Sequence, residues 1–391
     1  MKVGILTYHR AINYGAVMQS FALVNKLSKD FSDDSFEVID YNCRKREVFI
    51  YKCPIVFLYR RSICEAFQKV FQTIEFKKAI KSLRLSKKNV GVSAEKINDF
   101  ISKNYDMVIV GSDAVFNWSD IGLPNAYFLT DINVKYKMAY AASAHLQNYN
   151  NITEQQKSIL ERSLKAFNYI GVRDDSTRNF VEYYTDCAVT TEHNCDPSII
   201  LKMDFSELNL QKKLKKHRFD FNKKTVFVML MNASYGEFAR KYFGDEVQIV
   251  ALMDGNKFAD IYLYDLNPFE WAHVFKYGSF LVTDYFHGTI FGLKNQIPVL
   301  SIDSSNYTNI EAGYESKAKD LLFRRLNLPF IYLDGRELQR ENGYERFTEQ
   351  IDIINREFDS EIVLERIEKE SKSYDDFADA YRLITEAEKE I

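Results

Sequence analysis

The chain has 391 residues, of which 46% are apolar and 27% are charged, and its formal net charge is -3. This length is enough for two or three domains, and 15 Gly and 6 Pro are too few for a disordered or low-complexity protein. Five cysteines without regular spacing argue against a disulfide scaffold. The strand-like Lys2–Tyr8 stands in place of a secretory leader, and no run of about 18 apolar residues follows, so we expect a cytoplasmic protein.

The first half of the chain alternates short apolar runs with amphipathic segments. Strands are predicted at Lys2–Tyr8, Phe36–Tyr41, Met107–Val110, Lys137–Ser143, Tyr169–Val172 and Ala188–Thr191. Helices are predicted at Ala16–Ser28, Ser93–Lys103, Thr153–Phe167 and Ser176–Tyr184. Such alternation is typical of a largely parallel sheet covered on both faces, so we expect an N-terminal Rossmann-like domain over residues 1–203.

A basic segment of about residues 43–90 interrupts this domain. Residues 43–88 contain 13 Lys or Arg and only three acidic residues. Apolar residues spaced three or four apart predict one face of a helix: Ile63, Phe67, Val70, Phe71 and Ile74. Basic residues, Lys69 and Lys77 among them, are expected on its flanks. A basic amphipathic helix is typical of a membrane-surface element, and the alternative is an ordinary packed helix with a solvated basic face. No nucleic-acid-binding motif accompanies the charge, so no nucleic-acid partner is expected.

The second half repeats the alternation after a lysine-rich connection at residues 204–224. Its predicted strands are Thr225–Met231, Val247–Met253, Phe280–Thr283 and Pro298–Ile302. Its predicted helices are Tyr235–Phe243, Asn267–Tyr277, His287–Asn295 and Glu315–Leu326. We therefore expect a second Rossmann-like domain over residues 225–355, and helices at 356–391 that pack back on the molecule. Two doubly wound α/β domains would bind their ligands in a cleft between the carboxyl ends of their strands.

Candidate site residues of the first domain follow its predicted strands. Asn13-Tyr14-Gly15-Ala16 precedes a helix, where free amides favour an anion, although Asn13 could simply cap that helix. Gly111-Ser112-Asp113 and Ala142-Ser143-Ala144-His145 could bind substrate hydroxyls or cap the next segment, and a histidine such as His145 is more often structural. Arg173 could bind a phosphate or carboxylate with two hydrogen bonds, or pair with neighbouring acids. Asp196 is read as a turn former.

The strongest candidate of the second domain is His287. It follows the strand that ends at Thr283 and stands at the start of a helix, beside amides that can bind an anion. Imidazole is the side chain best suited to donate a proton near neutral pH. Asp284 could orient His287 or cap the helix. We therefore expect His287 to be functional.

Six motifs in this order resemble those of the polysaccharide pyruvyltransferase family over about residues 1–330. They are Asn13-Tyr14-Gly15-Ala16, Gly111-Ser112-Asp113, Tyr140-Ala141-Ala142-Ser143, Val172-Arg173-Asp174, Asp196-Pro197 and Thr283–Thr289. The resemblance implies transfer of pyruvate from phosphoenolpyruvate to two hydroxyls of a sugar, giving a cyclic ketal, in two Rossmann-like domains arranged as in GT-B glycosyltransferases. Tyr285 stands where some members have Arg, and His145 where many have Gly.

The resemblance also implies roles for the site residues. The donor and its phosphate would meet Asn13, Gly15, Arg173, Tyr285, Phe286, Gly288 and Thr289. The acceptor sugar would meet Ser112, Asp113, Ser143 and His145. His287 would be the general acid or a ligand of the donor's phosphate, and Asp113 or Asp284 would be the base.

The implied acceptor is a hexose such as galactose in a lipid-linked oligosaccharide, used for surface or capsular polysaccharide. A lipid-linked acceptor would give the basic segment at 43–90 a use, docking on the inner face of the membrane. We see neither a metal-ligand cluster nor a nucleotide-binding glycine motif, so phosphoenolpyruvate would act without a cofactor. Two alternatives stay open: a glycosyltransferase that uses a nucleotide sugar, and a non-catalytic glycan-binding paralogue.

Overall fold

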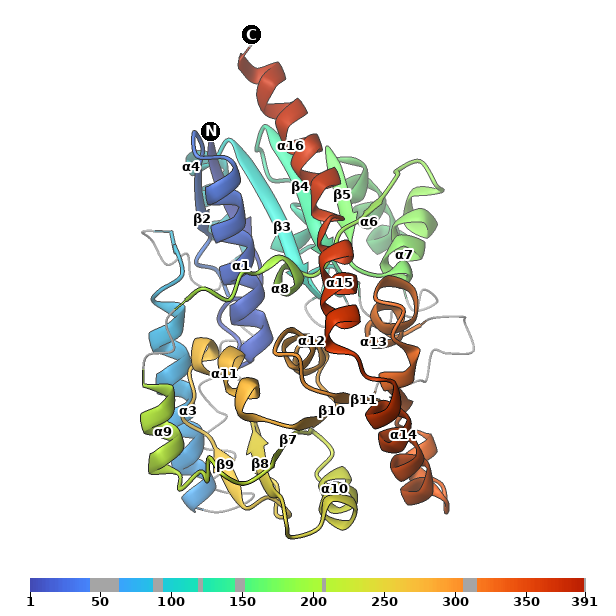
Figure 1. Cartoon of the computed structure of the whole chain (residues 1–391). Coiled ribbons are helices and arrows are strands. Elements are labelled where there is room, and N and C mark those ends of the chain that lie inside the picture. The colour runs from blue at the N-terminus through green and yellow to red at the C-terminus, as the bar shows by residue number, and fades with distance from the viewer. Residues whose placement is uncertain are drawn as a thin grey trace.

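Two parallel sheets of six strands each form the framework of the protein, one above the other in Figure 1. The computed structural model describes residues 1–42, 63–86, 94–118, 122–144, 152–205, 209–304 and 315–389. All strands of the first sheet lie within residues 2–193 and all strands of the second within 225–334. The predicted α/β architecture of two doubly wound halves is therefore confirmed.

The first sheet has the strand order β2-β1-β3-β4-β5-β6. Its strands are β1 (Lys2–Leu6), β2 (Ser35–Val38), β3 (Met107–Asp113), β4 (Tyr136–Ala142), β5 (Tyr169–Val172) and β6 (Glu192–His193). The order reverses between β1 and β3, and ligands of doubly wound sheets bind at such a switch point. The strand predicted at Ala188–Thr191 is wrong, because β6 begins only at Glu192 and pairs with β5 through Gly171 and Val172.

The second sheet has the order β12-β11-β10-β7-β8-β9, which is the Rossmann order counted from β7. Its strands are β7 (Thr225–Met229), β8 (Gln248–Leu252), β9 (Ile261–Leu263), β10 (Phe280–Thr283), β11 (Val299–Asp303) and β12 (Tyr332–Asp334). The edge strands β9 and β12 were not predicted, because runs of three residues are too short to show a pattern. The switch point lies between β7 and β10.

The two faces of the first sheet pack against different helices. Met107 and Ile109 of β3 share a core with α1 (Tyr14–Asp30) and α16 (Tyr374–Lys389). Val108 and Val110 share the other core with α4 (Ala94–Asn104), α6 (Glu154–Lys165) and α7 (Asp175–Thr185). Successive residues of a strand point to opposite faces, so this apolar run fills both cores.

One continuous core joins the second sheet to helices of both halves. The helices of the second half are α10 (Tyr235–Phe243), α11 (Pro268–Val274), α12 (Phe286–Lys294), α13 (Lys317–Lys319), α14 (Gly343–Glu357) and α15 (Ser360–Ser371). Short 3₁₀ turns are Ala126–Phe128, Phe275–Tyr277, Pro329–Ile331 and Glu337–Gln339, and Asp320–Arg325 is a π-helical turn. Tyr14 of α1 enters this core and stacks on Trp271 of α11, with ring centroids 4.9 Å apart. Aromatic burial therefore fixes the start of α1 against the second half.

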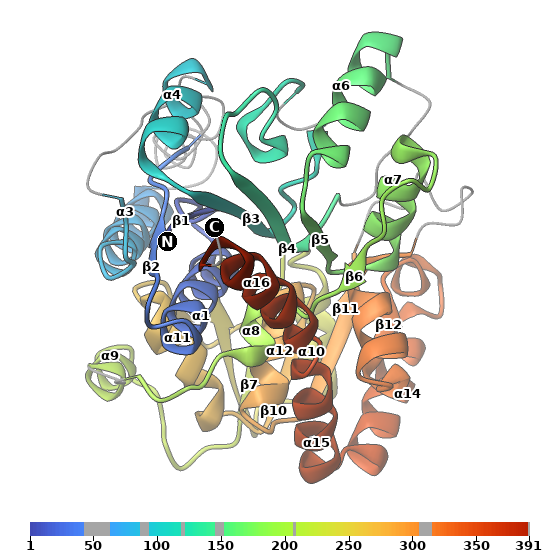
Figure 2. The same ribbon diagram turned by 90° about the horizontal axis from the view of Figure 1, so that it is seen from above.

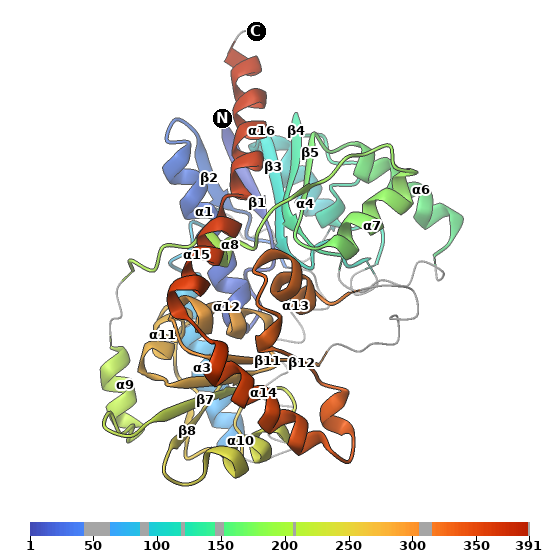
Figure 3. The same ribbon diagram turned by 45° about the vertical axis from the view of Figure 1, so that its right-hand side comes forward.

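The C-terminal helices and the contacts of Lys294 both connect the two halves. α15 runs beside the second half and α16 continues past the first sheet (Figures 2 and 3), where Tyr381 donates to Asp34 at 2.6 Å. On α12, Lys294 donates to three carbonyl oxygens at the end of the short helix α8 (Pro197–Ile200), those of Ser198, Ile199 and Leu201, at 2.7–2.8 Å. Burial lowers the pKa of Lys294 to about 8. These contacts attach α16 to the start of β2 and the end of α12 to α8.

The basic segment and the lysine-rich connection each contain a helix. α3 (Ile63–Ile80) follows the predicted periodicity, and α9 (Leu210–Lys216) lies beside it (Figure 1). Lys69 does not lie on a solvated flank as expected, because it is buried and its Nζ lies 2.8 Å from Asp254 Oδ1. Residues 43–62 and 87–93, which hold the rest of the basic segment, lie outside the described residues. Within the described part of the chain, no helix is long and apolar enough to cross a bilayer.

Candidate active site

The strand ends of the two sheets bring four ionisable side chains together. Asp113 ends β3, Arg173 follows β5, Asp196 precedes α8 and His287 lies in the first turn of α12. Figure 1 shows α12 between the two sheets. Parallel strands place their carboxyl ends at one edge, and here the two edges face each other.

The carboxylate of Asp196 connects the two halves at this point. Its Oδ2 accepts a hydrogen bond from Arg173 Nη1 at 2.9 Å and lies 3.4 Å from His287 Nε2. Its Oδ1 accepts from the amide of Ser198 at 2.9 Å. Burial alone would raise the pKa of this carboxyl, but His287 and Arg173 hold it well below its usual range. Asp196, read from the sequence as a turn former, is therefore the charged partner of His287.

Arg173 is a buried guanidinium with unused donors. It is 5% exposed, and among the described residues its Nε and Nη2 have no hydrogen-bond partner. Its Nη2 lies 4.0 Å from Asp113 Oδ1, and its guanidinium lies 5.1 Å from the ring centre of Phe286. Burial by itself lowers the pKa of Arg173, but Asp196 and Asp113 raise it above the ordinary value. Two open donors on a fixed guanidinium suit a carboxylate or phosphate.

Lys317 is a site residue that the sequence analysis missed. Its Nζ lies 5.1 Å from the Phe286 ring, on which Arg173 also packs. Burial, followed by the charge of Arg173, lowers the pKa of Lys317, while Asp113 and Asp196 raise it. The helix 315–326 was predicted, but nothing in the sequence indicates which of its basic residues faces the other half.

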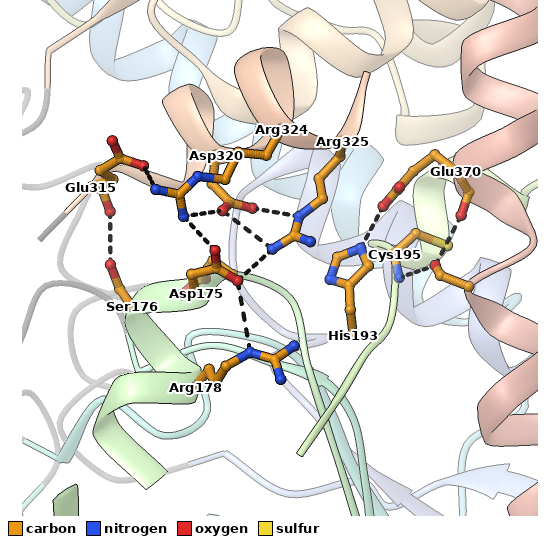
Figure 4. A network of polar contacts seen from close by, with 12 residues as sticks. Asp175, Ser176, Arg178, His193, Cys195, Glu315, Asp320, Arg324, Arg325 and Glu370 are labelled. Atoms are coloured by element: carbon orange, nitrogen blue, oxygen red, sulfur yellow. Dashed lines mark hydrogen bonds and ion pairs between the residues drawn. The ribbon is translucent and has the colours of Figure 1, made fainter. Parts of the chain in front are cut away.

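An ion-pair network positions the segment that carries Lys317 (Figure 4). Arg325 lies 2.6 Å from Asp175 of α7, and Arg324 pairs with the same carboxylate. Ser176 donates to the carbonyl oxygen of Glu315 at 2.9 Å. Burial alone would raise the pKa of Asp175, but the charges of Arg325 and Arg324 hold it below the usual range. The first half therefore sets where residues 315–325 lie.

Gly15 serves the site by its lack of a side chain. A β-carbon at this position would lie 2.0 Å from both Cγ and Nδ1 of His287. Asn13 caps α1, since its Oδ1 accepts from the amide of Ala16 at 3.2 Å. The structure thus shows a helix cap at Asn13 and a packing contact at Gly15, and phosphate binding by this loop stays a prediction.

Asp284 does not orient His287, contrary to one prediction. Its carboxylate instead accepts hydrogen bonds from the amides of Met231 at 2.8 and 3.0 Å and of Asn232 at 3.1 Å. Burial raises the pKa of Asp284 to about 6, against the lowering effect of these amides. Asp284 therefore connects the end of β10 to the segment that follows β7, at the switch point of the second sheet.

Tyr285 also points away from Arg173. Its hydroxyl donates to Asp254 Oδ2 at 3.0 Å, and Asp254 in turn pairs with Lys69 of α3. Burial and then Asp254 raise the pKa of Tyr285 far above its ordinary value. Tyr285, which was predicted to contact the donor substrate, thus connects the start of α12 to α3 through Asp254.

The other predicted residues of α12 shape its first turn. The absent side chain of Gly288 leaves room for Thr283, whose Oγ1 would lie 2.6 Å from a β-carbon there. Thr289 is buried and its hydroxyl lies 2.8 Å from that of Ser301. The N-cap residue Tyr285 makes no side-chain capping bond, and the first amides of a helix have no partner within it. These amides and the helix dipole favour an anion beside Phe286 and His287.

The residues predicted for the acceptor lie at different depths. Ser112 is fully buried and donates to the carbonyl oxygen of Ala141 at 3.1 Å. Ser143 is buried and donates to Asp174 Oδ2 at 2.7 Å, so both hydroxyls are used inside the protein. Asp113 is half-buried, and Arg173 keeps its pKa below the usual value despite its burial. His145 lies outside the described residues.

The sequence model of the polysaccharide pyruvyl transferase family matches residues 13–306, which contain all of these site residues except Lys317. The chain belongs to this family. The pyruvyl transferase assignment makes the chain a transferase whose family acts in polysaccharide pyruvylation. No curated protein sequence matches it.

Solved structures similar to this pyruvyl transferase family member are distant in sequence. A UDP-GlcNAc 2-epimerase from Neisseria meningitidis is 12% identical, covers 97% of this chain and 99% of its own, and has a TM-score of 0.46. S. aureus MnaA, in a co-structure with UDP, is 10% identical over 95% of this chain and 92% of its own, with a TM-score of 0.48. E. coli ADP-heptose lps heptosyltransferase II is 10% identical over 91% and 99%, with a TM-score of 0.40. The assignment to a family rests on the sequence match alone.

Proposed function

We propose that the chain transfers pyruvate from phosphoenolpyruvate to two hydroxyls of a sugar and forms a cyclic ketal. The observation that carries this proposal is the buried Arg173, which has two donors without a partner among the described residues and shares the Phe286 ring at the start of α12 with Lys317. Phosphoenolpyruvate has a carboxylate and a phosphate three bonds apart, and a cluster of cations with helix amides suits both. The proposed reaction needs no cofactor besides this donor.

The positions of the charged residues support binding of the two anionic groups of phosphoenolpyruvate by residues from different halves of the protein. Arg173 would bind the carboxylate or the phosphate in the plane of its guanidinium group, which packs on Phe286. Lys317 and the first amides of α12 would hold the remaining charge. Asp196 keeps Arg173 and His287 in place and supplies no contact of its own, because its oxygens are already engaged.

The proposed chemistry begins with a proton added to the methylene carbon of the donor. The carbon that carries the phosphate then becomes an electrophilic centre, which one sugar hydroxyl attacks while losing its proton. The carbon–oxygen bond to phosphate breaks, phosphate leaves with the electron pair, and the second hydroxyl closes the ketal on the same carbon while its proton passes to the released phosphate. A positioned general acid accounts for roughly 10²–10⁴-fold of the rate in such steps.

His287 is the proposed acid or the ligand of the donor's phosphate. It is 8% exposed and is fixed between Gly15 and Asp196, so its ring has one orientation. Of the two proposed bases, Asp113 lies beside Arg173, whereas Asp284 is held by the amides of Met231 and Asn232. The geometry therefore favours Asp113 as the base that accepts the sugar's proton.

The proposed acceptor is a hexose such as galactose, carried on a lipid-linked oligosaccharide during surface or capsular polysaccharide synthesis. A lipid-linked acceptor would bring the protein to a membrane surface through the region of residues 43–90. The support for this part is the helix α3, whose apolar stripe is exposed.

The test is phosphate release from phosphoenolpyruvate, measured with and without a galactoside or lipid-linked acceptor, in wild type and His287→Ala. Acceptor-dependent release that falls at least 10²-fold in the variant is expected. A lower kcat with unchanged KM for the donor identifies His287 as the acid, and a raised KM identifies it as the phosphate ligand. Reaction in D₂O should place one deuterium in the product's methyl group.

The outcomes that contradict the proposal are specific. No release with any acceptor, combined with saturable binding of a uridine or guanosine diphosphate sugar, would support the glycosyltransferase alternative. Saturable glycan binding without turnover of either donor would support the non-catalytic alternative.

A further inference from the structure

The outer face of α3 carries an unusual concentration of exposed apolar side chains. Of the twelve large hydrophobic residues exposed in the described part of the chain, five lie on this helix. They are Ile63, Phe67, Val70, Phe71 and Ile74, with exposed fractions of 66%, 62%, 41%, 50% and 42%. Their spacing places them on one side, which we call the α3 stripe. A contiguous patch of this kind marks an interaction surface.

Packing explains why this stripe faces outward. The opposite side of α3 is attached to the second half by polar groups, since Gln72 Nε2 donates to the carbonyl oxygen of Met253 at 2.9 Å. Lys69 of the same side pairs with Asp254, and Phe76 and Ile80 lie in the main core. The helix is therefore fixed by its inner side, and the periodic apolar residues lie on its exposed side.

Positive charge borders the stripe from a second helix. α9 contains Lys212, Lys213, Lys215 and Lys216 and no acidic residue. A groove of about 390 Å³ runs between the two helices and is lined by Phe71 and Ile74 from α3 and by lysines from α9. Lys78 on α3 adds a side chain that is 65% exposed. The acidic members of the groove engage two of these lysines, Glu75 with Lys213 and Asp265 with Lys216, so the exposed Lys212 and Lys215 carry the charge that this face offers to a partner.

We propose that the α3 stripe and the lysines of α9 together form a docking surface for an anionic lipid bilayer. Apolar residues of an amphipathic helix enter the boundary between headgroups and acyl chains, and flanking lysines contact anionic headgroups. The positive charge of this face favours an anionic bilayer over a second copy of the chain, because a second copy would bring its own lysines against the first set and the two would repel each other. The inference deepens the proposed function and rests on it for the lipid-linked acceptor.

The position of α3 connects this surface with the site. Its inner residue Lys69 contacts Asp254, and Asp254 accepts from Tyr285, which directly precedes the first turn of α12. One helix thus has an outer face for the bilayer and an inner face that holds the start of α12. An acceptor on a lipid carrier would be presented beside the residues that hold the donor.

Co-sedimentation with vesicles tests the surface without any donor. The full chain is expected to bind vesicles of phosphatidylcholine mixed with phosphatidylglycerol, to bind phosphatidylcholine alone much more weakly, and to be released by salt. Phe67→Ser with Phe71→Ser should weaken binding at least about 10-fold. Lys212→Gln with Lys215→Gln should weaken it about 20-fold or more, at about fivefold per residue. All four positions are exposed, so folding should be kept.

Matched controls lie on the terminal helices. Leu383→Ser, at a position that is 69% exposed on α16, and Lys369→Gln on α15 should leave vesicle binding unchanged. Equal binding by wild type and the stripe variants, or no binding to anionic vesicles, would overturn the proposal. A dimer that the Phe67 and Phe71 substitutions convert to monomer, without vesicle binding, would assign the face to a second copy and overturn it as well.

Failure of this surface and failure of the proposed function are distinguishable. The stripe variants should release phosphate with a soluble galactoside at the wild-type rate and lose activity only toward a lipid-carried acceptor in vesicles. Vesicle binding without phosphate release from any acceptor would contradict the proposed function and leave the surface in place.

Discussion

Gly15 and His287 are in direct contact across the two halves of the protein, at a distance that no other residue in place of Gly15 would allow. A β-carbon on Gly15 would lie 2.0 Å from two ring atoms of the imidazole, and real β-carbons do not approach so closely. The start of α1 in the first half therefore sets the position of the histidine in the second. The same contact keeps the imidazole within 3.4 Å of Asp196.

Gly15→Ala should therefore displace His287 and lower kcat/KM at least about 100-fold, because a shift of about 1 Å in a positioned group costs this much. Phosphate release measures the effect. His287→Ala removes the obstructing ring, so adding Gly15→Ala to that variant should cost little further stability or activity. Additive losses in the double variant would contradict this explanation.

Lys317→Met should raise the KM for phosphoenolpyruvate about 10- to 100-fold, the size expected for one charged hydrogen bond to an anion. Burial lowers the pKa of Lys317, so this residue loses its charge at a lower pH than an ordinary lysine. In wild type, the KM for phosphoenolpyruvate should therefore begin to rise at that lower pH. The matched control is Lys319→Met, two residues along, whose side chain is 40% exposed and pairs with Glu315. Equal KM values for the two variants would remove Lys317 from the donor site.

Asp284 should impose a pH dependence on stability. Its pKa is raised to about 6 in the folded protein, against about 3.9 in an unfolded chain, so folding favours its protonated form. This contribution to the unfolding free energy is fully present below about pH 4 and lost as the pH rises through 6, by about 3 kcal/mol. Urea unfolding of wild type and Asp284→Asn at pH 4 to 7 measures it. Parallel curves for the two proteins would contradict the assignment.

Lys69→Met should destabilise the protein by about 1–3 kcal/mol, because Asp254 would lose its cationic partner at a largely buried contact. Lys81→Met, at an exposed position just beyond α3, should change the unfolding free energy by less than about 0.5 kcal/mol. Denaturant titration of both variants compares them. A cost no larger for Lys69 than for Lys81 would contradict the buried role of Lys69.

Much of the framework follows from local sequence. Apolar runs such as Met107–Val110 and Phe280–Thr283, each followed by a turn, predict parallel strands because strands buried on both faces need unbroken apolar residues. Rossmann-type halves place ligands at strand ends, so Asp113, Arg173 and His287 could be found in this way. The limits of this approach appear at β9 and β12, whose three residues carry too little pattern.

What the sequence by itself determined is therefore the strands, the turns after them and the side chains at their ends, because these depend on residues close together in the chain. Only the tertiary structure decided which of those side chains meet. Asp196 and His287 are 91 positions apart, and Lys317 reaches the site through contacts of Asp175 with Arg324 and Arg325. The direction of the α3 stripe was decided in the same way, since a period of 3.6 residues defines a face but not what that face meets.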